Sequence, residues 1–149
     1  MKKIIIVSTS FFFLLSSCKK ENSASTPATC NKTMPDIAGT YSLVKVEAGL
    51  ADPLSDITTS ELKPCQLDDK LVLNSSGTAN YQDLGIACTP SGSESGTWSI
   101  GSDGKVTINA GTTVVANAEI VSFDCATLVI LTNRVVSGIS VKFRLTIKK

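Results

Sequence analysis

The sequence contains no histidine, and this absence excludes several kinds of chemistry. Catalysis by a nucleophile that histidine activates is excluded, and so is a zinc site with histidine ligands. Glycines occur singly at turn-like positions, so the chain has no glycine-rich phosphate loop. The 14 basic and 13 acidic residues nearly balance, which gives no support for nucleic-acid binding. We therefore expect neither an enzyme nor a cofactor, and no nucleic-acid partner.

Long apolar runs are also missing, except for one at the N-terminus. Residues 4–15 are largely apolar and follow Lys2 and Lys3, but the run is too short for a spanning helix, which needs about 20 apolar residues. A positive start before such a run is typical of a signal peptide. Residues 15–18 read Leu-Ser-Ser-Cys and resemble the lipobox of bacterial lipoproteins. We expect a signal peptide over 1–17 and lipidation of Cys18, the alternative being an ordinary signal peptide with an incidental cysteine.

The predicted anchor defines the mature chain. Acyl groups on Cys18, such as palmitate, contribute about 0.8 kcal/mol per buried methylene, so several of them hold a protein at a membrane without a spanning helix. Residues 18–36 are polar and rich in Ser and Thr, which predicts a flexible tether. Residues 37–149 have the length of one domain. The mature chain keeps 12 basic and 13 acidic residues, a net charge of −1.

The pattern beyond residue 37 is typical of β-strands. Short segments rich in β-branched and aromatic residues alternate with turns rich in Gly, Asn, Asp and Ser. The segment at 139–147 alternates strictly between apolar and polar residues, so it has one buried and one exposed face. The eight predicted strands are 39–47, 69–74, 78–84, 95–100, 104–110, 113–123, 126–132 and 139–147.

Helical patterns between these strands are missing, with one exception. Parallel strands need long crossover connections, usually helical, so we expect antiparallel pairing. Sequential strands with short turns predict an all-β, eight-stranded, antiparallel up-and-down barrel, in which closure removes exposed edges. A two-sheet sandwich remains the alternative. The exception is a short helical turn near 55–62, in the first long connection, where Ser55 would cap it and Pro64 would end it.

Four cysteines remain once Cys18 is assigned to lipid, and an even number in an exported chain indicates disulfides. No two of them are close in sequence, so a metal site is not expected. Three pairings are possible. A hairpin in which Asn74 opposes Thr78 brings Cys65 near Cys88. Cys30 and Cys125 then pair by elimination.

Three segments together resemble a known family. They are CQLDDKLVLNSSGTANYQDLG at 65–85 with the following cysteine at 88, SGTWSI at 95–100, and the later Ile-x-x-Phe and Thr-Leu-Val-Ile-Leu between 120 and 131. In this order they resemble the lipocalin-like domains on lipoproteins of Bacteroidetes-type bacteria, over about residues 37–149. The resemblance implies a lipocalin-like barrel with a cup open at one end. It also implies a monomer that lipid anchors to the outer membrane, on either its periplasmic or its surface face.

The resemblance also implies a plug at the closed end of the barrel. The lipocalin Gly-x-Trp of the first strand corresponds to Gly39-Thr40-Tyr41 here, with Tyr in place of Trp. Arg134 or Arg144 is then the candidate to stack on this aromatic ring.

Candidate functional residues are few. Trp98, Tyr81 and Phe143 are candidates for ligand contact, although a single Trp on a half-buried strand is more often part of the core. Asp68 and Asp69 are adjacent carboxylates at a strand start, where neighbours point to opposite faces, so we expect them to solubilise the strand end. The loop at 85–96 could border the barrel mouth, but a plain connection is the simpler interpretation.

Two classes of function remain. The first is a binding protein whose cup holds a small apolar or amphipathic molecule at the cell envelope. The second is a structural or interaction module with a filled barrel and no ligand. Bulky side chains predicted to point inward would decide between them: Leu71, Leu73, Trp98, Ile100, Val106, Ile108, Phe143 and Leu145.

Overall fold

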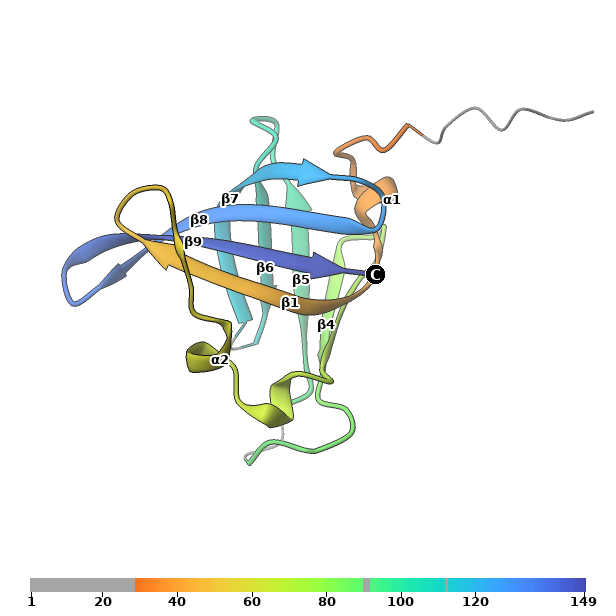
Figure 1. The fold of residues 1–149 in the computed structure, drawn as a ribbon. Helices are drawn as coiled ribbons and strands as arrows, with labels where there is room; N and C mark the ends of the chain where they lie inside the picture. The colour runs from red at the N-terminus through yellow and green to blue at the C-terminus, as the bar shows by residue number, and fades with distance from the viewer. Residues whose placement is uncertain (1–28, 90–91, 112) are drawn as a thin grey trace, which may run out of the picture.

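Eight antiparallel strands close into a barrel in the computed structural model, which describes residues 29–89, 92–111 and 113–149 (Figure 1). A two-residue strand, β2, pairs with the end of β1 on the edge away from β9. The strands are β1 Gly39–Gly49, β2 Ser55–Asp56, β3 Lys70–Leu73, β4 Thr78–Gln82, β5 Glu94–Ile100, β6 Val106–Ala110, β7 Thr113–Phe123, β8 Thr127–Val136 and β9 Ile139–Lys148. The predicted signal peptide and Cys18 lie outside the described residues.

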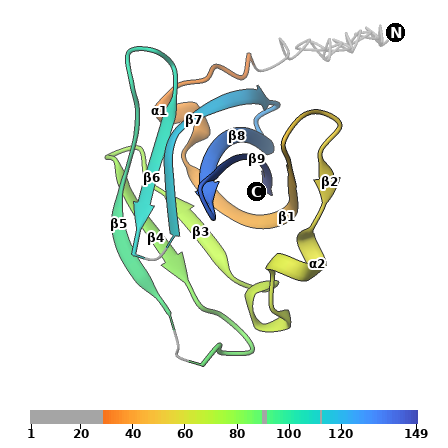
Figure 2. The ribbon, with the colours of Figure 1, turned by 90° about the vertical axis from the view of Figure 1, so that its left-hand side faces the viewer.

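Strand β1 closes the barrel because it pairs on both sides. Its first residues pair with β3, with Gly39 opposite Leu73, and its later residues pair with β9, from Ser42 opposite Lys148 onward. A bulge between Leu43 and Lys45 bends β1 within the stretch that pairs with β9, and Figure 2 shows β1 curving past β9. The predicted up-and-down barrel is therefore confirmed, and the alternative of a two-sheet sandwich is wrong.

The β3–β4 hairpin has the predicted register. Leu73 lies opposite Ala79, and Lys70 opposite Gln82, which continues the expected pairing of 74 with 78. Gly77 in the turn has φ +90, a conformation that favours glycine. The turn chemistry visible in the sequence therefore fixed the alignment of both strands.

The first long connection differs from its prediction at its start. Ser55 belongs to β2 and caps no helix, and the helix α2 spans only Thr58–Glu61. The Asp56 carboxylate accepts hydrogen bonds from the Thr58 N–H and hydroxyl and so orders the chain just before this helix. A 3-10 turn, η1 Pro64–Gln66, follows. Within the described ranges, no helix is both long enough and apolar enough to cross a membrane.

A short helix covers the closed end of the barrel. Helix α1, Met34–Ile37, spans the last three residues of the predicted tether and the first residue of the predicted domain. Ile37 is fully buried, and the Tyr41 hydroxyl donates a hydrogen bond to its carbonyl oxygen. Burial raises the pKa of Tyr41 to about 12, so this donor keeps its proton at neutral pH. The C-terminus lies beside α1 (Figure 1).

The cation that stacks on the Tyr41 ring is Lys149, with its Nζ 5.5 Å from the ring centroid. The expectation of an arginine partner is wrong. Arg134 lies over Phe143 instead, and Arg144 forms ion pairs with Asp52 and Glu47.

Two disulfides connect loops to the barrel: Cys65–Cys88 and Cys30–Cys125. The first pair was expected from the hairpin register and the second by elimination. Cys30–Cys125 links the segment before α1 to the β7–β8 turn at the closed end. Cys65–Cys88 links η1 to the β4–β5 connection at the opposite end.

Candidate functional site

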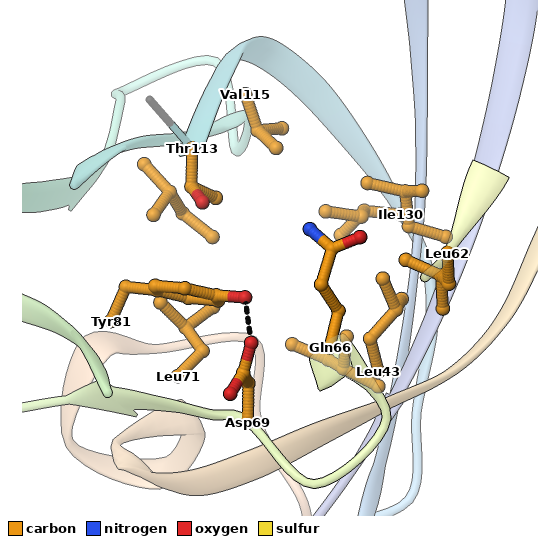
Figure 3. Close-up of a pocket in the computed structure, with 12 residues that line it drawn as sticks. Leu43, Leu62, Gln66, Asp69, Leu71, Tyr81, Thr113, Val115 and Ile130 are labelled. Atoms are coloured by element: carbon orange, nitrogen blue, oxygen red, sulfur yellow. Dashed lines mark hydrogen bonds between the residues drawn. The ribbon is translucent and has the colours of Figure 1, made fainter. Parts of the chain in front are cut away.

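A cavity of about 180 Å³ lies inside the barrel, toward the end that η1 and α2 partly cover (Figure 3). Most of its lining is aliphatic: Leu43, Leu62, Leu71, Ile108, Val115, Ile130, Leu145 and Ile147. Four polar side chains complete it: Gln66, Asp69, Tyr81 and Thr113. A mostly apolar wall with a few polar groups is typical of small-molecule sites.

Strand alternation explains which residues of β3 and β4 line the cavity. Leu71 and Tyr81 lie directly opposite each other, so their side chains share the inner face. Asp69 precedes β3 by one residue and has the same phase as Leu71, so its side chain points inward as well. Figure 3 shows these three side chains together on one side of the cavity.

Asp69 is only 5% exposed and accepts two hydrogen bonds. The Tyr81 hydroxyl donates to its Oδ2, and the Leu84 backbone N–H donates to its Oδ1 at 3.1 Å. Because both partners are donors, the group acts as an acceptor through both oxygens, as a carboxylate does. Burial raises the pKa of Tyr81 above its ordinary value, and the hydrogen bond and charge of Asp69 raise it further. Tyr81 therefore remains a hydrogen-bond donor at neutral pH.

Gln66 reaches the cavity from η1. Its Oε1 accepts a hydrogen bond from the Lys63 backbone N–H at 2.9 Å, which orients the side-chain amide. Figure 3 shows the Gln66 side chain among the residues that line the cavity. The neighbouring Cys65 is bonded to Cys88, so the disulfide holds η1 beside the barrel mouth. A nonlocal covalent bond therefore positions Gln66.

The three aromatic candidates lie in different places. Tyr81 lines the cavity. Trp98 is 2% exposed in the core, and its Nε1–H donates to the Asn74 carbonyl oxygen at 2.7 Å, in the β3–β4 turn. Phe143 does not line the cavity and packs under the Arg134 guanidinium. The structure therefore brings only Tyr81 of these three to the candidate site.

Asp69 is the residue whose role sequence reasoning missed. The expected solubilising role is wrong for it, because its carboxylate is buried against Tyr81. Asp68 points elsewhere, and its Oδ2 accepts a hydrogen bond from the Ile86 N–H. The two carboxylates therefore do not act as a pair. This agrees with the prediction that neighbouring residues at the strand start point to opposite faces. Gln66 was also missed.

Asp69, Asp83 and Cys88 come close together beside the cavity. The Cys88 sulfur is bonded to Cys65 and is not a thiolate ligand. Asp83 accepts hydrogen bonds from the Cys88 and Gly92 N–H groups and so orders the β4–β5 loop. This cluster is therefore explained by the structure of the loop.

Comparison with known proteins gives two similarities. A family model described as a lipocalin-like domain matches residues 37–130. Among solved structures, a complex of bovine odorant-binding protein with a selenium-containing odorant is similar, with 13% sequence identity and a TM-score of 0.45, over 84% of this chain and 77% of that chain. The curated protein sequences give no match.

Proposed function

The chain belongs to the lipocalin-like domain family, and we propose from this premise that its barrel binds a small apolar or amphipathic ligand. The observation that carries the proposal is the cavity of about 180 Å³ with an aliphatic wall and a polar side. An apolar cavity of about 150 Å³ in another protein holds benzene. The ligand therefore has about the size of a single ring with a short substituent.

Bulky interior side chains set this size. Ile108 and Leu128 are almost fully buried, and Leu71 on β3 and Leu145 on β9 line the cavity. The barrel is thus filled at its closed end and hollow toward its mouth. A long acyl chain would have to displace core side chains, so we propose compact ligands.

Filling the cavity tests this function. Val115 lines the cavity and is 4% exposed, whereas Val114 points outward from the same strand. We expect Val115→Phe to reduce binding of a ring-sized probe such as 2-phenylethanol by tenfold or more, because its ring occupies the site. NMR titration of the 15N-labelled protein measures the affinity and also shows whether each variant is folded.

Val114→Phe is the matched control, since it adds the same ring to the outer face. Its affinity for the probe should equal that of the wild type. Equal binding by a folded Val115→Phe protein would contradict the cavity as the site, and so would the absence of probe binding to the wild type.

The anchoring of the barrel is a separate part of the proposal. We propose that Cys18 carries lipid and holds a monomeric, non-catalytic domain at the outer membrane of a Bacteroidetes-type bacterium. The Leu-Ser-Ser-Cys motif after an apolar run supports this, as does the position of Cys30 at the closed end of the barrel. A tether that joins there leaves the cavity mouth at the opposite end.

Replacement of the acylated residue tests the anchor. Cys18→Ser should move the protein from the membrane fraction to the soluble fraction of the expressing bacterium, because no acyl chain is attached. Ser16→Ala keeps a small residue in the motif and should leave the protein in the membrane fraction. Wild-type protein in the soluble fraction would contradict lipidation.

A second candidate function rests on the β8–β9 hairpin, which extends beyond the barrel (Figure 1). Val135 is 75% exposed at its tip, and Val136 and Ile139 are also exposed. Exposed aliphatic groups of this kind favour an interaction module. Purification from the native host distinguishes the two functions. A small molecule that co-purifies with the protein supports ligand binding in the cavity. A partner protein that co-purifies with the wild type but not with Val135→Asp supports an interaction through the hairpin.

A further inference from the structure

The polar side of the cavity carries one charged group and no balancing cation. Among the described residues that line the cavity, Asp69 is the only one with an acidic carboxyl group, and none is Lys or Arg. Tyr81 remains protonated, and the remaining polar groups, Gln66 and Thr113, are neutral. The nearest basic residues along the chain, Lys70 and Lys63, do not line this cavity. The Lys70 ammonium donates a hydrogen bond to the Ser42 hydroxyl, and Lys63 lines a neighbouring surface pocket.

The hydrogen-bond geometry leaves Asp69 able to accept more. Each of its oxygens receives one bond, from Tyr81 and from the Leu84 N–H, and a carboxylate has about four acceptor positions. The group is 5% exposed, so a charge brought beside it is only weakly screened by solvent. The energy of a close pair of charges in such a place is large compared with that of a neutral contact.

We infer that the cavity selects ring-sized ligands with a hydrogen-bond-donating head, ammonium above hydroxyl, and excludes carboxylates. This inference rests on the proposed binding function and adds the class of ligand. The ring lies against the aliphatic wall, with its head toward Asp69 and Gln66. A carboxylate head would place two negative charges together with no basic side chain in the lining, whereas an ammonium pairs with Asp69.

Three probes with the same ring test the inference: 2-phenylethylamine, 2-phenylethanol and phenylacetate. We expect the full-length protein in NMR titrations at pH 7 to bind the amine at least tenfold more tightly than phenylacetate, with the alcohol between them. The Leu84 amide should shift on binding of the amine, because it donates to the same carboxylate. Equal affinities for the amine and phenylacetate, or tighter binding of phenylacetate, would overturn the inference.

Two variants connect the ranking to Asp69. Asp69→Asn should remove the preference for the amine while binding of the alcohol changes by less than threefold. Tyr81→Phe keeps the charge and should keep the ranking. Glu119→Gln removes the same charge from an exposed position on β7 and serves as the control for a general effect of net charge.

The outcomes distinguish this inference from the function on which it rests. Binding of the alcohol with no discrimination by charge leaves the proposed function intact and overturns the inference. Binding of none of the three probes overturns both. Should Asp69→Asn fail to fold, the ranking on the wild type and on Tyr81→Phe still decides.

Discussion

Trp98→Ala is expected to lower the free energy of unfolding by about 3–5 kcal/mol, which is a large part of the stability of an ordinary domain. The side chain is 2% exposed and belongs to the cluster of buried apolar side chains that extends through the barrel. Its loss leaves a cavity at the closed end, where the barrel has little freedom to collapse. The midpoint of thermal unfolding should fall by roughly 10–20 °C.

Urea unfolding followed by far-UV circular dichroism measures this effect, because the variant has lost the only Trp of the chain. Trp98→Phe is the companion variant, expected to cost about 1–2 kcal/mol. It loses the Nε1–H bond to Asn74, but the Asn74 carbonyl still accepts the Gly77 N–H at 2.9 Å. Val121→Thr, on the exposed outer face, should change stability by less than about 0.5 kcal/mol. A loss below 1 kcal/mol in Trp98→Ala would contradict a packing role for Trp98.

The architecture was predictable from the sequence because its determinants are local. The alternation at 139–147 identifies the inner face in the last part of β9, where Leu145 lines the cavity and Ile147 is buried, whereas Ile139 is exposed in the hairpin that extends beyond the barrel. The Gly77 turn fixes the register of β3 and β4, and that register places Cys65 near Cys88. In each case neighbouring residues carry the information.

Strand boundaries were less predictable where the environment of a strand changes along its length. The strand predicted at 126–132 continues to Val136, because the β8–β9 hairpin extends into solvent and needs no alternation there. Strand β1 was expected to end at residue 47, yet it continues to Gly49 beside β9. Pairing of the backbone extends these strands beyond their hydrophobic pattern.

The candidate site was only partly predictable, because alternation tells inside from outside but not which end of the barrel a residue occupies. Tyr81 and Trp98 both point inward, yet one lines the cavity and the other fills the closed end. Asp69 has the same phase as Leu71 and Leu73, and this signal would have placed it inside. Gln66 had no such signal, since its position depends on η1 and on the Cys65–Cys88 bond.

Removal of the Cys30–Cys125 disulfide is expected to destabilise the protein more than removal of Cys65–Cys88. The bonds join residues 95 and 23 positions apart. In the chain-entropy description these separations correspond to losses of about 4.7 and about 3.4 kcal/mol, as upper values. We therefore expect Cys30→Ser with Cys125→Ser to have the lower urea midpoint of the two double variants.

The closed end gives a structural reason for the same order. Cys30 holds the segment before α1, and α1 contributes the buried Ile37. In the same segment, the Lys32 ammonium donates a hydrogen bond to the Ile120 carbonyl oxygen at 2.6 Å. Without the disulfide this segment is retained by noncovalent contacts only, these two among them. Hydrogen exchange at the Ile37 amide, which donates to the Thr33 carbonyl, should therefore accelerate. Unchanged protection, or a larger loss on removing Cys65–Cys88, would contradict this role.

The backbone at Cys125 allows the contribution of the bond to be separated from that of the turn. Cys125 has φ +71, a left-handed conformation that costs a residue other than glycine about 1–2 kcal/mol. In the Cys30→Ser background, Cys125→Gly should therefore be more stable than Cys125→Ser by up to about 1 kcal/mol, although glycine also loses more entropy on folding. A serine variant as stable as the glycine variant would show that the turn relaxes once the disulfide is absent. The disulfide would then hold the left-handed conformation in place, in addition to restricting the unfolded chain.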